Sequence, residues 1–399
     1  MIPAGRSRRG GGESRQAMRR FAGIALALAT LAPAFGGIIP ARAALPPIRH
    51  VFTIMLENQE MVTTFGAGQV GWPYLARTLP LMGAFVPNYF GTGHNSLDNY
   101  IAMVSGQGPN ADTQSDCEDA TTMGDNGHFS FDADGQAIGV GCTYPVSVQS
   151  IATQLAAKGF TWKGYMEDMD ARPGVKRQTC QGPFTANTIE SPVPPGNPKP
   201  TPSYRAKHNP FVYFHNIFDD LAYCDARDVP FTGFFHDLQS EATTPNYSMI
   251  VPDQCNDAHD FPTCADGTRG GPQRASQWLK VVVPKILASP AYKHDGLLII
   301  VFDEGLLPLS CCGEKKAPNL AADNNNGGSY GPFTPLATGG GQTGAIMISK
   351  YIKPATLSLR FYNHYSYLRS MEDLFGLAHL GYAAQAGLRP FGADIYTAG

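Results

Sequence analysis

Two short apolar runs in the sequence decide the fold class: VFTIMLEN, residues 51–58, and LLIIVFDE, residues 297–304. Each run is almost wholly apolar for six positions and then ends abruptly at two polar residues. Runs without alternation are typical of strands that are covered on both faces, as in a mostly parallel sheet. Residues 247–251 and 345–349 are two further candidate strands.

Helical patterns lie between these candidate strands, over residues 147–158, 273–288 and 367–374. Strands and helices that alternate along a chain favour an α/β fold. We therefore predict a mostly parallel central sheet with helices on both faces and long loop insertions.

The first 43 residues predict an export signal that is not part of the fold. Arg19 and Arg20 precede an apolar run over residues 21–31, and the segment closes on Ala-Arg-Ala at 41–43. This order is typical of a secretory signal peptide, and Met18 could begin such a signal by itself. Because the segment lacks a stop-transfer flank, it favours a periplasmic or secreted protein without a stable membrane anchor.

The charge balance weighs against a nucleic-acid partner. Residues 1–43 hold seven of the 30 Lys and Arg residues and one of the 33 Asp and Glu residues. Residues 44–399 therefore carry 23 basic and 32 acidic side chains, a formal net charge of −9. No basic run or basic–aromatic stripe remains there. The excess acid could surround cations, or it could form a solvated acidic surface.

All eight cysteines lie in residues 44–399. An even number in an exported chain predicts disulfides, and Cys117 with Cys142 and Cys255 with Cys264 are plausible local pairs. A zinc site is the alternative, although the chain has no CxxC pair to support it.

Paired oxygen ligands follow the two deciding strands, Glu57-Asn58 after the first and Asp303-Glu304 after the second. Ligands in open α/β sheets bind beyond the carboxyl ends of strands. Three carboxylates in one crevice would repel each other unless a cation lay between them, which predicts a divalent metal ion. Oxygen-rich ligation favours Ca, Mg or Mn, and added histidines would admit Zn. The alternative is that each pair caps a following helix or turn.

Ser96 stands at the start of a short predicted helix over residues 97–105, which Gly106 ends. Free N–H groups and the positive dipole end at a helix start attract anions. A serine there can attack a phosphate when a nearby metal stabilises its alkoxide. The alternative is that Ser96 is only the N-cap.

Four histidines stand among polar neighbours in predicted loops, and they are His94, His208, His259 and His364. Any one of them could be a structural hydrogen-bonding group, but such a set predicts that at least one or two act on substrate or metal.

Seven short motifs, taken together, resemble the secreted phosphoesterase family that includes bacterial acid phosphatases and non-haemolytic phospholipases C. They occur in the family's order and span nearly all of residues 44–399. The motifs are residues 48–58, His94-x-Ser96-x-x-Asn99-Tyr100, WKGYME at 162–167, HNPF at 208–211, NDAHD at 256–260, FDEG at 302–305 and NHYS at 363–366.

The resemblance implies a single catalytic domain over residues 44–399 with an alkaline-phosphatase-like core. It implies that Ser96 becomes phosphorylated, and that Glu57, Asn58, Ser96, Asp303 and Glu304 hold the metal. We expect His94 or His259 to protonate the leaving oxygen. Asn99, His208, Asp257 and His364 are then expected to contact the substrate.

The expected substrate is a small-molecule or lipid phosphate ester. Phospholipases C of this family look longer, with added C-terminal β modules, which favours a phosphatase or small phosphodiesterase here. A metal-independent secreted esterase and a non-catalytic exported binding protein are the two rival interpretations. The absence of a G-x-S-x-G motif weighs against a lipase-type esterase.

Overall fold

An eight-stranded sheet runs through the protein, with the strand order β11-β2-β10-β9-β1-β8-β6-β7. Strands β9, β1, β8, β6 and β7 run parallel to one another, whereas β10 is antiparallel to both β9 and β2. The strands are β1 (His50–Leu56), β2 (Ala84–Val86), β6 (Trp162–Met166), β7 (Asp228–Pro230), β8 (Tyr247–Val251), β9 (Gly296–Phe302), β10 (Ala345–Ser349) and β11 (Thr356–Leu357).

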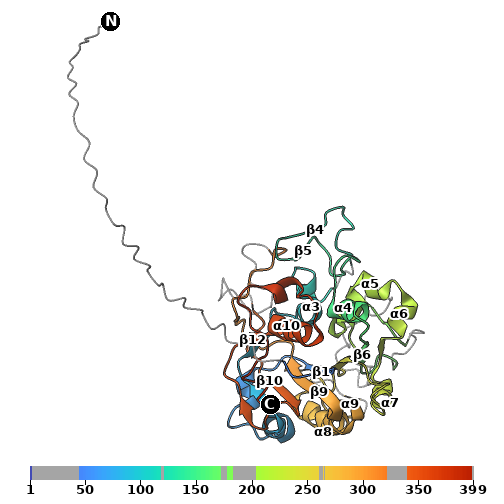
Figure 1. Ribbon diagram of the computed structural model, residues 1–399, viewed down its shortest axis with the longest axis vertical. Coiled ribbons are helices and arrows are strands. Elements are labelled where there is room, and N and C mark those ends of the chain that lie inside the picture. Colours follow the sequence, from blue (N-terminus) through green and yellow to red (C-terminus); the bar gives the residue numbers. More distant parts are fainter. Residues whose placement is uncertain are drawn as a thin grey trace, which may run out of the picture. The chain divides into compact units, whose positions relative to one another are not determined.

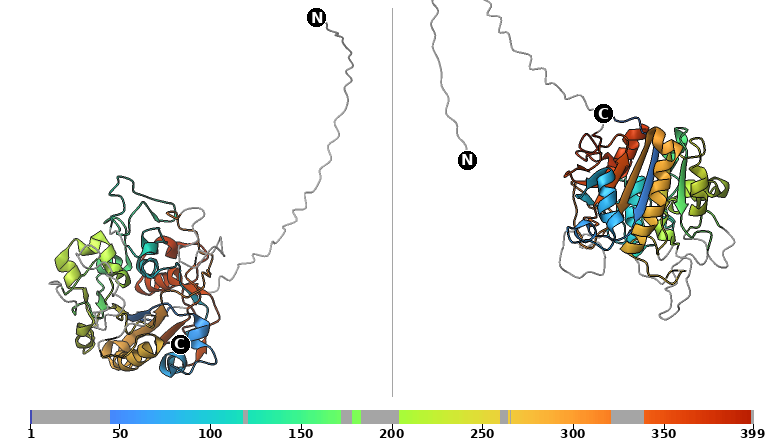
Figure 2. Two further views of the ribbon diagram at one scale, coloured as in Figure 1. Left: turned by 180° about the vertical axis from the view of Figure 1, so that it is seen from behind. Right: turned by 90° about the horizontal axis from the view of Figure 1, so that it is seen from below.

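Helices cover both faces of this sheet, each over its own apolar core (Figures 1 and 2). Val51 and Met55 of β1 point into the core under α3 (Ser96–Ser105), α4 (Ile151–Ala157) and α10 (His364–Phe375). Phe52 and Ile54 point into the core under α8 (Pro272–Ala288) and α9 (Pro290–Asp295). Because successive side chains of a strand alternate between faces, one apolar run supplies both cores. The predicted mostly parallel sheet with helices on both faces is confirmed.

Capping residues set the helix starts that the sequence pattern misplaced. Helix α4 begins at Ile151, four residues later than predicted, because the Ser150 hydroxyl accepts from the Thr153 N–H and Thr153 bonds back to the Ser150 backbone. This arrangement is a capping box. Helix α10 begins three residues earlier than predicted, because the Asn363 side chain accepts from the Ser366 N–H.

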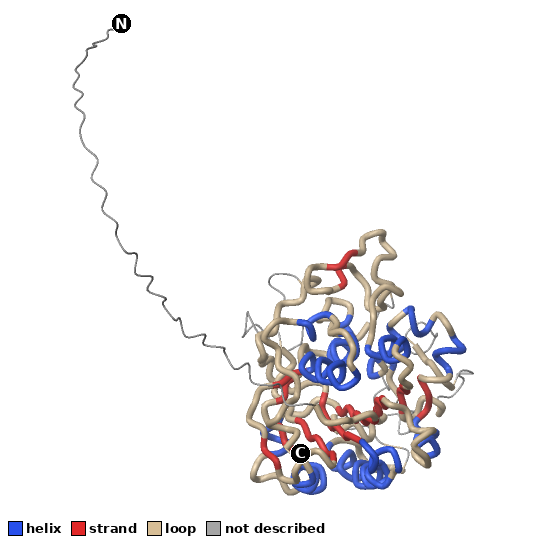
Figure 3. Tube along the Cα trace, in the orientation of Figure 1, coloured by secondary structure: helices blue, strands red, loops and turns tan. Residues whose placement is uncertain are grey.

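The remaining elements are short and lie in long loops (Figure 3). The pairs β3 (Tyr89–Phe90) with β12 (Tyr362–Asn363), and β4 (Ser130–Phe131) with β5 (Ala137–Ile138), form two small sheets. The short helices are α1 (Met61–Phe65), α2 (Leu79–Met82), α5 (His215–Phe218), α6 (Leu221–Asp225), α7 (Phe234–Asp237), η1 (Tyr74–Thr78), η2 (Thr113–Ser115), η3 (Ala206–His208), η4 (Pro210–Tyr213), η5 (Phe231–Gly233) and η6 (Gly381–Ala384).

The computed structural model describes Met1 and residues 45–117, 121–171, 178–182, 204–259, 264, 266–320 and 339–397. The predicted export signal, residues 1–43, lies outside this range apart from Met1. Within the described residues, no helix combines the length and the apolar character needed to cross a membrane.

Four disulfides join all eight cysteines, which confirms the prediction of disulfides. Two of them are the expected local pairs, Cys117–Cys142 and Cys255–Cys264. The other two are Cys180–Cys224 and Cys311–Cys312.

Candidate active site

Two buried acids lie side by side where β1 and β9 end. The register pairs Leu56 with Phe302, so the next residues, Glu57 and Asp303, leave neighbouring strands at the same edge. The Asn58 N–H donates to Asp303 Oδ1 at 2.7 Å, which ties the two strand ends together. Both acids are almost fully buried. This edge is where ligands bind in α/β sheets.

The hydroxyl group of Ser96 points toward one of these acids, Glu57. Its Oγ donates to Glu57 Oε2 at 2.8 Å. The N-cap of α3 is Asn95, which has φ 78°, and Ser96 is the first helical residue. The N-cap alternative for Ser96 is therefore wrong, because its hydroxyl bonds to a carboxylate and not to the helix backbone. One turn later on α3, the Tyr100 hydroxyl donates to Glu57 Oε1 at 2.6 Å.

His208 approaches the same carboxylate from η3. Its Nε2 lies 3.3 Å from Glu57 Oε2, and its ring stacks on Tyr100 with centroids 5.4 Å apart. Burial holds the pKa of His208 well below its usual range, and nearby Lys207 and Arg205 lower it further. The lowered pKa favours the neutral form of the imidazole beside Glu57.

Glu304 is paired with His94. The distance from His94 Nδ1 to Glu304 Oε2 is 2.5 Å, and the Asn95 N–H donates to the same oxygen at 3.1 Å. Burial raises the pKa of Glu304 to about 7. His94 Nε2 is buried and has no hydrogen-bond partner among the described residues. Glu304 thus fixes Nδ1 of His94, whereas Nε2 makes no hydrogen bond within the described part of the chain.

A glycine allows the loop before α3 to pack against the acids. A Cβ on Gly91 would lie 2.6 Å from the backbone oxygen of Asp303 and 2.9 Å from that of Gly340. Backbone atoms cannot yield as a flexible side chain can, so only glycine permits this approach.

The acids repel each other in the absence of a cation. Burial raises the pKa of Glu57 well above its usual range, and the charges of Asp303 and Asp257 raise it further. Burial likewise raises the pKa of Asp303. Asp303 Oδ2 has no hydrogen-bond partner among the described residues. A divalent cation would relieve both the repulsion and the unpaired oxygen, so the donor set fits an oxygen-ligated metal.

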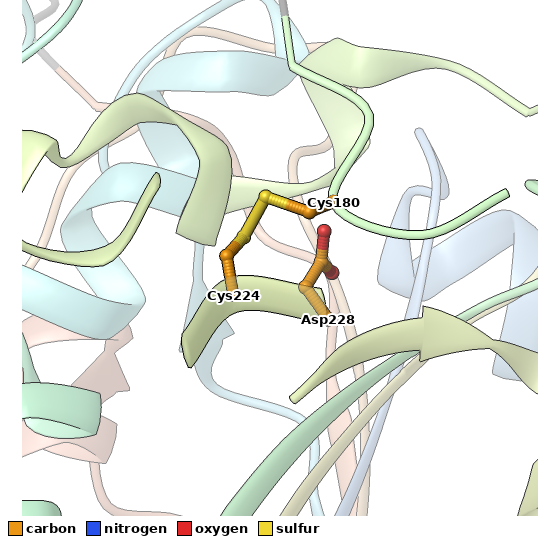
Figure 4. A group of neighbouring side chains, drawn as sticks. All are labelled: Cys180, Cys224 and Asp228. Atoms are coloured by element: carbon orange, nitrogen blue, oxygen red, sulfur yellow. A yellow bond between two sulfur atoms is a disulfide. The ribbon is translucent and has the colours of Figure 1, made fainter. Parts of the chain in front are cut away.

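One compact trio of possible metal ligands is excluded by its chemistry. Cys180, Cys224 and Asp228 place donor atoms within 4.8 Å of one another, and they are the only such trio of His, Cys, Asp and Glu in the described chain (Figure 4). The two sulfurs form a disulfide, whereas metal binding requires thiolates. The cysteine zinc alternative is therefore wrong. Glu57 and Asp303 form no such trio with Glu304, which contacts His94.

Comparison with known proteins identifies the family. The family model described as "Phosphoesterase family" matches residues 75–378. The chain belongs to the phosphoesterase family.

Relatives of the chain are distant in sequence. It is 24% identical over 334 residues to a "Probable acid phosphatase" of Kluyveromyces lactis, covering 84% of this chain and 59% of that protein. It is 27% identical over 302 residues to a "Phosphate-repressible acid phosphatase" of Penicillium chrysogenum, covering 75% of this chain and 53% of that protein. The chain thus spans little more than half of either relative.

A third relative matches over most of its length. It is a "Phosphatidylinositol-3-phosphatase" of Mycobacterium tuberculosis, 23% identical, with 92% of each chain covered. Among solved structures, the chain is similar to a member of the alkaline phosphatase superfamily from Vibrio parahaemolyticus. That similarity has a TM-score of 0.48 and 13% identity, and covers 87% of this chain and 72% of the other.

Two side chains predicted to bind the substrate, Asn99 and His364, form hydrogen bonds with the protein itself. Asn99 Oδ1 accepts from the N–H groups of Thr92 and Gly93, and its Nδ2 donates to the Gly93 carbonyl. Nε2 of His364 donates to the Asp303 carbonyl at 2.6 Å. A carbonyl can only accept, so Nε2 carries the proton of the neutral ring, whose pKa burial lowers to about 4. Both side chains position backbone at the site in this arrangement.

His259 and Asp257 contact the Glu57-Asn58 segment, His259 through its ring and Asp257 through its backbone. The Asn58 side-chain Nδ2 donates to His259 Nδ1 at 3.2 Å, and His259 is exposed. The Asp257 carbonyl accepts from the Glu57 N–H at 2.7 Å. His259 is the solvent-facing histidine of the set.

Tyr100 is the functional neighbour that sequence reasoning missed. It belonged to a recognised motif, but no role was assigned to it. The signal was its spacing: a residue four positions after Ser96 in a helix lies on the same face. Its hydroxyl therefore reaches the carboxylate that Ser96 contacts.

Proposed function

We propose that the protein hydrolyses phosphate esters with the help of a divalent metal ion and with Ser96 as its nucleophile. The observation that carries the proposal is the bond from Ser96 Oγ to buried Glu57, beside Asp303 at the end of the sheet. The names of the acid phosphatase relatives support the same class of reaction.

Glu57, Asn58, Ser96, Asp303 and Glu304 would hold the metal ion. Glu57 and Asp303 stand together, Asn58 is tied to Asp303, and Glu304 follows Asp303 directly. When bound, the ion would neutralise the buried acids and stabilise the alkoxide of Ser96. Calcium, magnesium and manganese suit the oxygen donors best.

Ser96 would form a covalent intermediate. A bond forms between its Oγ and phosphorus as the bond from phosphorus to the leaving oxygen breaks, with the serine proton positioned to pass to Glu57 Oε2. His94 or His259 would protonate the leaving oxygen. Glu304 holds His94 by its Nδ1, and Asn58 holds His259 by its Nδ1. Water then attacks the phosphoserine and releases Ser96 and phosphate.

His208 is our candidate for contact with a phosphate oxygen. Its Nε2 is buried, lies near the oxygen that Ser96 contacts, and has no hydrogen-bond partner within the described chain. We assign Asn99 and His364 to positioning, because their polar atoms bond to the protein. We assign Asp257 an electrostatic role, because its charge raises the pKa of Glu57.

Replacement of Ser96 by alanine tests the nucleophile. We expect Ser96→Ala to lower the rate of p-nitrophenyl phosphate hydrolysis at least about a thousandfold, with unchanged thermal unfolding. Ser105→Ala is the matched control, because Ser105 lies on the same helix and its hydroxyl bonds to the Ile101 carbonyl. Wild-type rates in Ser96→Ala would end the proposal. Activity that resists chelators, with turnover of p-nitrophenyl acetate, would favour the rival esterase.

Phospholipid-linked phosphate is a second candidate substrate. The relative that matches over 92% of both chains is named a phosphatidylinositol-3-phosphatase. A panel that compares p-nitrophenyl phosphate, a phosphodiester and a phosphoinositide monoester in mixed micelles distinguishes a phosphatase from a phospholipase C. Preference for the diester would favour the phospholipase C alternative.

We also propose that residues 1–43 direct export to the periplasm or the medium and that residues 44–399 act as one catalytic domain. The four disulfides support an oxidising compartment. Detection of the mature protein outside the cytoplasm, with its N-terminus near Ala44, tests this.

A further inference from the structure

Exposed apolar side chains gather on two segments near the candidate active site. Residues 306–309 begin two positions after Glu304, and residues 359–361 lie between β11 and β12. Leu307 and Phe361 are each 55% exposed, far more than core residues of their type. We call the five exposed residues Leu306, Leu307, Leu309, Leu359 and Phe361 the apolar rim.

Contacts through Phe90 and residues 341–342 connect the two segments. Phe361 stacks on Phe90 with ring centroids 5.9 Å apart, and Phe90 forms a β-bridge with Gln342. The neighbouring Gly341 N–H donates to the Leu309 carbonyl at 2.9 Å. The rim is therefore one neighbourhood of the fold, although its members are about 50 residues apart in sequence.

The backbone of the first segment is held while its side chains stay exposed. The Leu307 N–H donates to Glu60 Oε1 at 2.7 Å, and the Leu309 N–H donates to the Leu307 carbonyl at 2.7 Å. Glu60 belongs to the chain that leads from β1 into α1. Exposed leucine side chains are unfavourable in water. A group of them on a hydrogen-bonded backbone is typical of an interaction surface.

Two arginines border the rim. A hollow of about 460 Å³ is lined by Cys312, Arg360, Phe361, Gly387 and Arg389. Both arginines are exposed, and the Arg360 side chain forms a long ion pair with Asp394, at 3.7 Å. Residues 44–399 carry a formal net charge of −9, so this basic edge differs in sign from the rest of the chain.

We propose that the apolar rim docks on an anionic phospholipid surface, with its leucines and Phe361 in the interface and Arg360 and Arg389 against lipid phosphates. Apolar side chains combined with flanking arginines are what such a surface recognises. Arg360 and Arg389 complement the negative charge of lipid phosphates, so an anionic membrane is the occupant that we propose, and a second copy of this chain is the rival occupant in the test below.

Docking would bring lipid-borne phosphate close to the active site, a consequence that rests on the proposed function. Leu306 follows the candidate metal ligand Glu304 by two residues. A Cβ on Gly340 would lie 2.3 Å from the Gly93 carbonyl. Residues 340–341, which bond to Leu309, therefore pack tightly on the loop before Ser96.

Sedimentation with vesicles tests the docking. We expect the wild-type protein to co-sediment with vesicles of equal parts phosphatidylcholine and phosphatidylglycerol, and weakly with phosphatidylcholine alone. Leu306→Ser with Leu307→Ser should lower the partition coefficient about tenfold or more, because two apolar side chains leave the interface. Leu307→Ser with Phe361→Ser should act alike, and Arg360→Gln with Arg389→Gln should remove the preference for anionic vesicles.

Leu221→Ser is the matched control. Leu221 is 53% exposed on α6, which packs near β7, and the sheet order puts β7 at the edge opposite β11. This variant should bind vesicles as the wild type does. All variants should hydrolyse soluble p-nitrophenyl phosphate at the wild-type rate, which separates loss of docking from loss of catalysis.

Three results would overturn the docking proposal. They are a wild-type protein that does not bind anionic vesicles, rim variants that bind as well as the wild type, and a wild-type dimer that the rim substitutions convert to monomer. A protein that binds vesicles through the rim but never hydrolyses a phosphate ester would instead overturn the proposed function alone.

Discussion

At the scale of single residues, Glu57 is the centre of the site. Ser96 and Tyr100 each donate a hydrogen bond to one of its oxygens, and His208 lies 3.3 Å from the oxygen that Ser96 contacts. A buried carboxylate with fixed donors presents its remaining lone pairs in one direction. Of these three residues, Tyr100 would act through Glu57 alone, and partners that orient a ligand in this way tune a metal site strongly.

Replacing Tyr100 by phenylalanine tests this arrangement. The change removes the donor to Glu57 Oε1 and leaves the ring in place. We expect the divalent-ion concentration for half-maximal hydrolysis to rise about 10- to 100-fold. Tyr144→Phe is the control, because that buried hydroxyl bonds to Asn110. An equal shift in both variants would contradict a specific role for Tyr100.

At the scale of elements, α3 places the proposed nucleophile at the site because its first residue, Ser96, contacts Glu57 at the end of β1. Asn95, with φ 78°, turns the chain so that Ser96 enters the helix facing Glu57. Gly106 ends the helix in a left-handed conformation, as predicted from its position. Sequence pattern located this helix well because its start and stop signals are local.

Helix α4 offers a test of capping that is independent of catalysis. We expect Ser150→Ala to lower the free energy of unfolding by about 1 kcal/mol, because the Thr153 N–H loses its acceptor. Urea unfolding measures the change, and phosphatase activity should stay unchanged. Ser147→Ala is the control, since exposed Ser147 precedes the helix. A larger loss in the control would restore the earlier predicted helix start.

At the scale of the whole molecule, a buried acid links stability to pH. Burial raises the pKa of Asp228 to about 7 from an ordinary 3.8. Between these values the folded protein keeps a proton that the unfolded chain has released. The free energy of unfolding should therefore fall as pH rises through this range.

Asp228→Asn should flatten this fall. The asparagine can still accept from Asn209 Nδ2, as Asp228 Oδ2 does at 2.8 Å, but it does not titrate. Each unit of pKa difference corresponds to about 1.4 kcal/mol. Between about pH 4 and pH 8, the decrease in the free energy of unfolding should therefore be smaller in the variant than in the wild type, by up to about 4 kcal/mol. Urea unfolding at several pH values measures both slopes, and parallel slopes would contradict the assignment.

The sequence by itself determined four of the eight sheet strands, the helices on both faces and the acid pairs at two strand ends. Those features depend on local burial patterns, which a run of apolar residues displays directly. Only the tertiary structure decided which side chains meet. Ser96 reaches Glu57 across 39 positions of sequence, and His364 reaches the Asp303 carbonyl across 61. Such contacts follow from strand register and loop packing. Residue order therefore could not predict that Glu304 contacts His94, or that Asn99 bonds to the loop that precedes it.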